Sequence, residues 1–271
     1  MRDHRPSDHA SSNPAAGTGA DLVVFDDRTE HDPVTQAALG PALIDLHTER
    51  AEPGQEYLRI YRTPPVLAFT GRDCASPGIG AAARAAIDHG FAPVRRGPGG
   101  RAAAHHRGAL CLDHVGGFDD AGLQITQRFA RFADLAAAAL AGLGVAAGVG
   151  AVPGEYCPGE YSVHDGQGHK LLGSAQRLTR TGWLFSTVII VSDPGPLRDV
   201  LVDVSAALDL DFDPVSVGAV GTAAPGVGRD QVQTALLAAL THHIPVTDSR
   251  LPPRALELAA TRAARHHVPG Y

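Results

Sequence analysis

The sequence predicts an α+β fold, with a mixed, largely antiparallel sheet flanked by helices. Helical and strand patterns are interleaved along the 271 residues, and several strand patterns follow one another as hairpin-like pairs. Residues 183–191 form a nearly continuous apolar, β-branched run, which is typical of a central buried strand. With 44% hydrophobic residues the chain can build a substantial core. These patterns favour α+β or mixed α/β over a Rossmann fold.

In the first half, a short apolar strand is expected at residues 21–25. A helix follows from Asp32 to about Arg50, because a proline stands just inside its start, and Pro41 is expected to kink or interrupt it. Residues 57–62 alternate with a period of two and residues 64–72 end in a glycine turn, which predicts a hairpin or an adjacent pair. The alanine-rich residues 79–90 predict a helix capped by Gly90, followed by a strand at 91–96.

Further along the chain, residues 101–115 are expected to be extended and to resume the sheet. Phe129, Phe132 and Leu140 share one face of a helix expected at 123–143. A hairpin containing Cys157 and Lys170 follows, with its turn at residues 165–168. After the buried strand at 183–191, helices are predicted at 196–208, 229–242 and 253–267.

Composition limits the class of protein. Residues 1–20 are polar and are expected to form a disordered tail, so that residues 21–271 make a single catalytic domain with a helical C-terminal segment. No signal peptide or membrane span is expected, and three cysteines without CxxC spacing disfavour disulfides and structural zinc. These features predict a cytoplasmic protein. A net charge of −6 argues against a nucleic-acid partner, and the absence of coiled-coil heptads favours a monomer.

The chain has a single lysine, Lys170, although Lys and Arg together number 23. This predicts a position where a compact ammonium is required and a guanidinium does not serve. Cys157 stands in a Pro/Gly-rich loop, where a packing cysteine is less usual than in a core. If Lys170 faces it, the cation lowers the pKa of the thiol and makes thiolate available. Cys157 and Lys170 are therefore the predicted catalytic pair, with an ordinary loop thiol and a solvated lysine as the alternatives.

A glycine-rich turn after the strand at 91–96 is the second candidate. Gly99 and Gly100 let backbone N–H groups approach a carbonyl or a phosphate, although a simple chain reversal is as good an explanation. Neither a phosphate loop nor a dinucleotide fingerprint is present, so no nucleotide is implied. Arg95 and Arg96 point to opposite faces of a strand, so that at most one reaches the site.

The remaining cysteines and histidines have simpler interpretations. Cys111 alternates with leucines in a strand and is expected to pack, and Cys74 lies in a loop; neither is expected to be a nucleophile. The three His-His pairs begin at His105, His242 and His266. Adjacent residues do not converge on one ion, and no further ligand spacing completes a site, so no metal is expected.

Three motifs in order resemble the lipoate-protein ligase and octanoyltransferase superfamily. They are Arg95-Arg96 with Gly99-Gly100, then His105 with Gly108, then Lys170-Leu-Leu-Gly-Ser-Ala-Gln-Arg177. The resemblance covers roughly residues 55–240. The element Tyr156-Cys157-Pro158-Gly159-Glu160-Tyr161 is similar to the cysteine-dependent amidotransferase branch. Arg101 and Ser186 depart from the family pattern, where a third glycine and a histidine are common.

The resemblance implies a fold similar to the catalytic domain of class II biotin and lipoate protein ligases. It implies acyl transfer in lipoyl assembly, in which Cys157 forms a thioester and Lys170 holds the substrate carbonyl. Backbone N–H groups of the glycine turn or of residues 173–175 stabilise the oxyanion in this hypothesis. The implied substrate-binding residues are Arg95, Arg96, Gly99, Gly100, Arg101, His105, Gly173, Ser174, Ala175 and Ser186.

The implied donor is an octanoyl-carrier protein, either the glycine cleavage H protein or acyl carrier protein. The implied acceptors are lipoyl domains of 2-oxoacid dehydrogenase E2 subunits, and no cofactor is implied. Two rival hypotheses remain. One is an ATP-dependent lipoate ligase in which Lys170 contacts an acyl-adenylate; the other is a non-catalytic acyl-binding protein, suggested by Arg101 and Ser186.

Overall fold

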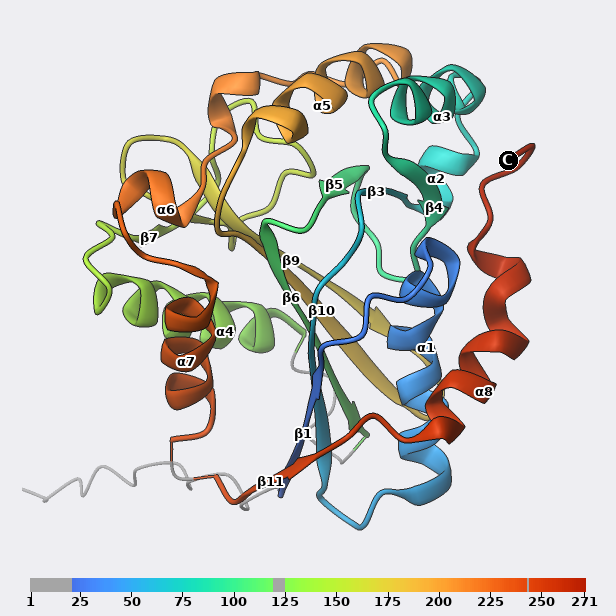
Figure 1. Ribbon diagram of the computed structural model, residues 1–271, viewed down its shortest axis with the longest axis vertical. Helices are drawn as coiled ribbons and strands as arrows, with labels where there is room; N and C mark the ends of the chain where they lie inside the picture. Colours follow the sequence, from blue (N-terminus) through green and yellow to red (C-terminus); the bar gives the residue numbers. More distant parts are fainter. Residues whose placement is uncertain (1–20, 119–124, 243) are drawn as a thin grey trace, which may run out of the picture.

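A large mixed sheet forms the centre of the protein (Figure 1). The computed structural model describes residues 21–118, 125–242 and 244–271. Within these residues the sheet has eight strands in the order β11-β1-β2-β6-β10-β9-β8-β7. The first two neighbouring pairs are parallel and the others are antiparallel. The strands are β1 (Leu22–Asp27), β2 (Glu56–Tyr61), β6 (Ala109–Gly117), β7 (Gly148–Val149), β8 (Val163–His164), β9 (Lys170–Leu178), β10 (Gly182–Ile190) and β11 (Val246–Ser249).

A second, three-stranded sheet lies beside one end of the large one. Its order is β4 (Ala92–Arg95), β3 (Val66–Phe69) and β5 (Ala103–His105). The short helix α2 (Gly71–Cys74) and the helix α3 (Ile79–Asp88) connect β3 to β4, and α5 (Gly195–Ala207) packs against α3. The turn between β4 and β5 is the glycine-rich segment, and it faces the large sheet across a cavity.

Helices cover both faces of the large sheet (Figure 1). α1 (Pro33–Arg50) and α8 (Pro253–Arg262) lie on one face, and α4 (Ile125–Ala141) and α7 (Arg229–Leu240) lie on the other. α1 begins where the Asp32 carboxylate accepts hydrogen bonds from the backbone N–H groups of Val34 and Thr35, and it continues through Pro41. The remaining short elements are α6 (Val220–Ala223) and the 3₁₀ turns Pro214–Ser216 and Ala263–His266.

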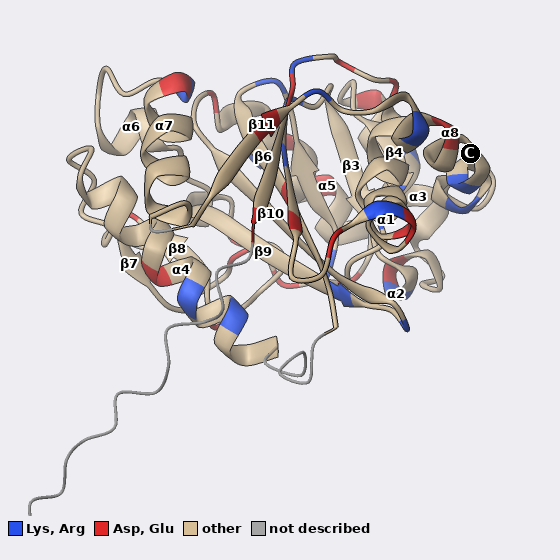
Figure 2. Cartoon of the chain, turned by 90° about the horizontal axis from the view of Figure 1, so that it is seen from below, with Lys and Arg blue, Asp and Glu red and all other residues tan. Residues whose placement is uncertain are grey.

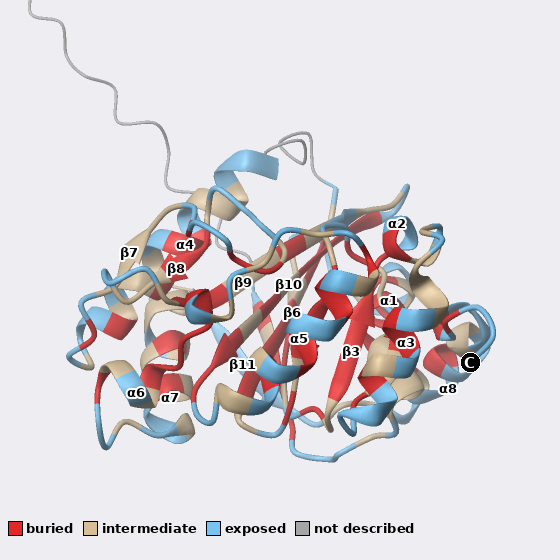
Figure 3. Cartoon of the chain, turned by 90° about the horizontal axis from the view of Figure 1, so that it is seen from above, coloured by how far each residue is buried: buried red, intermediate tan, exposed pale blue. Residues whose placement is uncertain are grey.

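Burial follows these layers. Figure 3 shows buried residues along the central strands and on the inner sides of the helices, with exposed residues on the outer side of α5. Acidic and basic residues are interspersed over the helices and loops (Figure 2). In the described ranges no helix combines the length and the apolar character needed to cross a bilayer.

The predicted fold class is confirmed, and the run at 183–191 is β10, between β6 and β9. One local prediction is wrong. Residues 57–62 and 64–72 form no hairpin, because β2 and β3 belong to different sheets; two prolines, which cannot donate to a ladder, separate them. Residues 101–115 are largely extended, as predicted, and they divide between β5 of the small sheet and β6 of the large one. The strand β11 was not predicted, and its four residues are all exposed.

The predicted hairpin around Cys157 is also wrong in part. β8 and β9 do form a hairpin with its turn at residues 165–168, but β8 is only two residues long. Cys157 lies in the loop before it. The predicted helix start at 123–124 and the predicted tail at 1–20 lie outside the described residues.

Candidate active site

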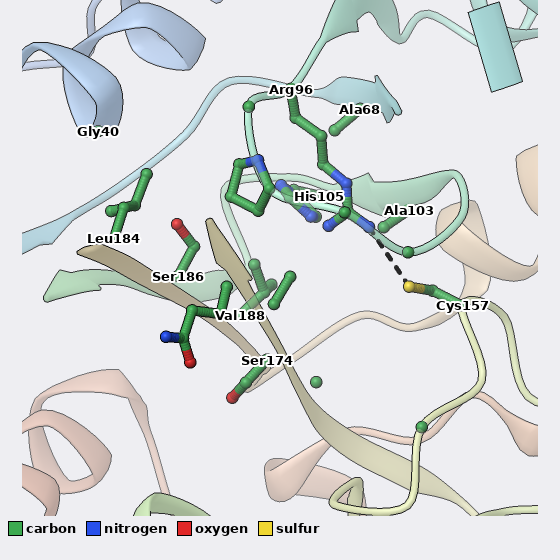
Figure 4. Close-up of a pocket in the computed structure, with 18 of the residues that line it drawn as sticks. Gly40, Ala68, Arg96, Ala103, His105, Cys157, Ser174, Leu184, Ser186 and Val188 are labelled. Atoms are coloured by element: carbon green, nitrogen blue, oxygen red, sulfur yellow. Dashed lines mark hydrogen bonds between the residues drawn. The ribbon is translucent and has the colours of Figure 1, made fainter. Parts of the chain in front are cut away.

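The cavity lies between β9 and β10 of the large sheet, α1, and the glycine-rich turn after β4. Its volume is about 480 Å³. Figure 4 shows Cys157 on one side, Val188 in the middle, and Ser186 and Leu184 on the opposite side. Most of the predicted site residues line it, namely Arg96, Gly99, Gly100, His105, Cys157, Lys170, Gly173, Ser174, Ala175 and Ser186.

The thiol of Cys157 accepts two hydrogen bonds. The Arg96 guanidinium donates through Nη2 and the backbone N–H of Arg101 donates from the glycine turn, each with a nitrogen to Sγ distance of 3.3 Å. Burial acts to raise the pKa of this thiol. The positive charges of Arg96 and Lys170, together with these hydrogen bonds, outweigh burial, so the pKa of Cys157 lies below its ordinary value.

Only glycine fits at position 100 without strain, because of the backbone conformation there and the close approach of the Cys157 sulfur. The φ of +100° at Gly100 is strained for residues with a side chain, and a Cβ here would lie 2.6 Å from the Cys157 Sγ. Gly99 is different, because a Cβ there would meet open space. The glycine turn therefore does more than reverse the chain, since it lets the backbone of Arg101 reach the sulfur.

Lys170 is almost fully buried, at 2% exposed, and its ammonium does not bond to the thiol. Nζ lies 2.6 Å from the Glu155 carboxylate oxygen Oε2 and donates to the carbonyls of Tyr156 and Cys157 at 3.0 and 3.1 Å. These three acceptors match the three N–H donors of an ammonium. The expectation that Lys170 is the main cation on the thiol is thus wrong: Arg96 makes the direct contact, and Lys170 acts at longer range.

Glu155 holds the loop that carries Cys157. One carboxylate oxygen accepts from the backbone N–H groups of Val152 and Gly159, and the other accepts from Ser162 Oγ at 2.6 Å and pairs with Lys170. Cys157 itself has a φ of +46°, which a residue with a side chain adopts only at a cost of about 1–2 kcal/mol. The contacts of Glu155 and Lys170 keep the loop in this conformation.

Sequence reasoning missed Glu155 as a functional residue. It stands two positions before Cys157, and the signal that could have found it was the single lysine, because a buried ammonium needs a carboxylate partner. Asp113 and Gln36, which also line the cavity, were missed for a different reason. Gln36 lies far from the motifs in sequence, and Asp113, although it follows Gly108 closely, is brought to Ser186 only by the pairing of β6 with β10.

Two predicted site residues lie outside the cavity lining. Arg95 is exposed and its carbonyl accepts from His266, as expected if only one of the two arginines faces the site. Arg101 contributes its backbone N–H, while its guanidinium contacts Asp73 at 3.4 Å. Burial lowers the pKa of His105 to about 3, with the charge of Arg96 adding to the effect, so this imidazole is neutral at physiological pH.

Cys111 and His106 are buried outside the cavity lining. Cys111 is fully buried in β6, and all three cysteines are free. His106 is bonded to the carbonyl of Asp193. In the described part of the chain no group of three or more His, Cys, Asp or Glu residues is placed to hold a metal ion.

The family model of the lipoyl protein ligase A/B catalytic domain matches residues 32–220. The chain belongs to this family. The match spans α1, the glycine turn, the Cys157 loop and the Lys170 strand, so every part of the cavity described above falls within it. The comparison with curated proteins gives no match.

Solved structures of lipoate-protein ligases share the fold. Lipoate-protein ligase A bound with ATP superposes with a TM-score of 0.73 at 20% identity, covering 92% of this chain and 95% of that chain. A putative lipoate protein ligase from T. acidophilum with bound lipoic acid gives 0.70 at 20% identity, with the same coverage. LipL1 of P. falciparum in complex with lipoate gives 0.60 at 12% identity, covering 89% of this chain and 70% of that chain.

Proposed function

We propose that this member of the family is an acyltransferase that moves an octanoyl or lipoyl group from a carrier protein to a lysine of a lipoyl domain, through a thioester on Cys157. The observation that carries the proposal is the state of the Cys157 thiol. It lines the cavity, accepts hydrogen bonds from Arg96 and Arg101, and has a lowered pKa. A thiolate stabilised in this way is a nucleophile, which a loop cysteine without a chemical role does not need.

In the first step the thiolate attacks the acyl carbonyl carbon of the donor. The new bond joins Sγ to this carbon, and the bond from the carbon to the carrier breaks. The carrier leaves as an amine or a thiol after taking up a proton. In the second step the amine of the acceptor lysine attacks the thioester, loses a proton, and releases the Cys157 thiolate. Two easier steps thus replace one direct exchange.

The contacts of Lys170 and Arg96 favour Arg96, and not Lys170 as predicted, as the hydrogen-bond donor to the substrate carbonyl. All three N–H groups of Lys170 are directed to Glu155, Tyr156 and Cys157. The buried Nε–H of Arg96, by contrast, has no hydrogen-bond partner among the described residues. Because Arg96 already contacts Sγ, we propose that it donates a hydrogen bond to the substrate carbonyl and stabilises the developing oxyanion. Lys170 then positions the Cys157 loop.

The acyl chain would lie in the cavity beyond the thiol. Apolar side chains line much of it, including those of Val66, Val94, Leu184 and Val188. The donor would be the glycine cleavage H protein or acyl carrier protein, and the acceptors would be lipoyl domains of E2 subunits. The acceptor is supported by the T. acidophilum system, whose bipartite lipoate protein ligase was solved as part of a study with its E2 lipoyl domain.

Intact mass spectrometry tests the proposal. The protein is incubated with octanoylated H protein or octanoyl-acyl carrier protein, without ATP, and its mass is compared with those of Cys157→Ala and Cys111→Ala. We expect one octanoyl adduct in the wild type and in Cys111→Ala, cleaved by hydroxylamine, and none in Cys157→Ala. Addition of a lipoyl domain should discharge the adduct onto its lysine.

Two outcomes would overturn the proposal. Acylation of the lipoyl domain that requires ATP and free lipoate, with no loss in Cys157→Ala, would establish a ligase that uses an acyl-adenylate. Binding of acyl groups or carriers with neither an adduct nor transfer under any condition would establish a non-catalytic acyl-binding protein.

A further inference from the structure

The wall of the cavity opposite the thiol is polar. Across the sheet, Arg59 of β2, Asp113 of β6 and Ser186 of β10 are direct cross-strand neighbours. Ser186 donates to the Asp113 carboxylate at 2.6 Å, and the Arg59 guanidinium lies 3.6 Å from its other oxygen. Asp113 is 3% exposed, and it lines the cavity together with Ser186.

This polar wall lies where the distal half of a bound acyl chain would be. Val188 pairs with Gly173, where an added Cβ would lie 3.2 Å from the Lys170 ammonium. Ser186 is two residues from Val188 on the same face of β10, about 7 Å further along the strand. Figure 4 places Val188 between Cys157 and Ser186. A chain attached to the thiol would therefore pass Val188 before it reaches Ser186.

Gln36 of α1 adds an amide to the same cavity. Its side chain is 5% exposed, and neither Oε1 nor Nε2 has a hydrogen-bond partner among the described residues. A buried polar group without a partner costs about 1–3 kcal/mol. A saturated chain beside Gln36 would leave this cost in place, whereas a ligand atom that donates or accepts a hydrogen bond would remove it.

The surrounding charges limit which ligand fits. An anionic end would meet the Asp113 carboxyl. A cationic end would approach a carboxyl whose charge is already opposed by the buried Arg59 guanidinium, which lies 3.6 Å from Asp113 and also pairs with Asp27 at 2.7 Å. Burial raises the pKa of Asp113, against the opposing charge of Arg59 and the hydrogen bonds from Ser186 and Tyr61. The wall is thus best matched by a neutral group that can hydrogen-bond.

We infer that Gln36 and the Ser186–Asp113 pair form a subsite for a neutral oxygen or sulfur substituent in the distal half of the acyl chain, so that substituted acyl groups are preferred to the saturated octanoyl group. The inference rests on the proposed function in one respect, since it takes the acyl chain to begin at Cys157. Gln36, Asp113 and Ser186 then determine specificity and take no part in bond making.

Calorimetric titration of Cys157→Ala with free acids tests the subsite without covalent chemistry. The probes are octanoate, 6-hydroxyoctanoate, 8-hydroxyoctanoate and lipoate. We expect lipoate or a hydroxylated acid to bind about tenfold more tightly than octanoate, equivalent to about 1.4 kcal/mol. Adding Gln36→Leu should remove this preference, because leucine cannot hydrogen-bond. Adding Gln127→Leu, on the exposed side of α4, should leave it unchanged.

The outcomes separate this inference from the proposed function. Equal or tighter binding of octanoate, or a preference that survives both Gln36→Leu and Ser186→Ala, would overturn the subsite and indicate that water occupies the wall. Octanoyl transfer by the wild type would still stand in that case. Conversely, a binding preference that depends on Gln36, in a protein that forms no acyl-enzyme, would support the subsite and contradict the proposed transferase function. Thermal unfolding of each variant confirms that it is folded.

Discussion

Cys111 and Cys157 lie in two contrasting regions of one molecule. Cys111 is in β6 and is fully buried, and burial together with the charge of Asp113 raises the pKa of its thiol to about 12. Cys157 is on a loop, where Arg96 and Arg101 donate to its sulfur and its pKa is lowered. Because both are free thiols in largely buried surroundings, the difference comes from hydrogen-bond donors and cations and not from burial alone.

The largest expected effect comes from the ion pair that holds the Cys157 loop. Glu155 and Lys170 are 1% and 2% exposed, and removing one partner leaves the other charged and buried. We expect Glu155→Gln and Lys170→Met each to destabilise the protein by about 3–5 kcal/mol. The double variant should lose much less than the sum of the two. Urea unfolding of the four proteins measures this coupling.

The same four proteins distinguish the effect of the ion pair on the position of the Cys157 loop from its effect on folding stability. If Lys170 and Glu155 act through the loop, acyl-enzyme formation should fall in every variant that remains folded at the assay temperature. If the destabilisation of the double variant equals the sum of the two single effects, Glu155 and Lys170 are not energetically coupled, which would contradict their description as an ion pair that holds the loop. A double variant that forms the acyl-enzyme at the wild-type rate would contradict the positioning role.

The next largest effect is expected at Arg96, the cation that distinguishes the surroundings of Cys157 from those of Cys111. Arg96→Met removes the cation that contacts Sγ, so the pKa of Cys157 should rise. When the pH lies below this pKa, raising the pKa by about one reduces the thiolate fraction about tenfold. Alkylation of Cys157 by iodoacetamide at a pH of about 7 should therefore slow about tenfold or more, and the midpoint of its pH profile should move to higher pH.

Arg95→Met is the matched control for Arg96→Met. Arg95 is the preceding residue, but it is exposed and lies outside the cavity lining. Its variant should keep the wild-type profile. An unchanged midpoint in Arg96→Met, or an equal shift in both variants, would show that Arg96 does not set the reactivity of the thiol.

The glycine turn gives a smaller effect. Gly100→Ala places a Cβ within 2.6 Å of Sγ at a φ of +100°, which strains the backbone by about 1–3 kcal/mol and pushes the sulfur away from the Arg101 N–H. We expect slower acyl-enzyme formation and slower alkylation. Gly99→Ala, with open space around its Cβ, should react as the wild type does. Equal rates in the two variants would argue against a role for the close approach.

The sequence predicted the parts of this site that lie in short motifs. Cys157, Lys170 and the Gly99-Gly100 turn were identified because an unusual residue or a glycine pair marks each of them. The identity of the thiol's cation was not predictable, because it depends on how a turn after β4 approaches a loop 61 residues later. Local pattern reasoning takes Lys170 as the partner since it is the nearest cation expected across a hairpin, and that hairpin does not include Cys157.

The fold was predicted in the same uneven way. α1, α5 and β10 were found near their observed bounds. Local signals mark two of them, since a proline stands just inside the start of α1 and β10 is a nearly continuous apolar run. The division of strands between two sheets was missed, since β2 and β3 differ in their partners and not in their composition. The polar wall was missed because Gln36, Asp113 and Ser186 come together only through the pairing of distant strands and the packing of α1.

The smallest expected effect concerns Cys111 and completes the comparison. Cys111→Ala removes one buried sulfur from β6, and buried cysteine acts mainly as a small hydrophobe, so we expect a loss of about 1 kcal/mol in stability and an unchanged rate of acyl-enzyme formation. In the wild type, mass analysis after brief alkylation of the native protein should place the label on Cys157 and leave Cys111 unmodified. Native-state labelling of Cys111 at a rate near that of Cys157 would mean that the pKa difference between the two thiols does not control their reactivity, and the argument for a thiolate nucleophile would lose its physical basis.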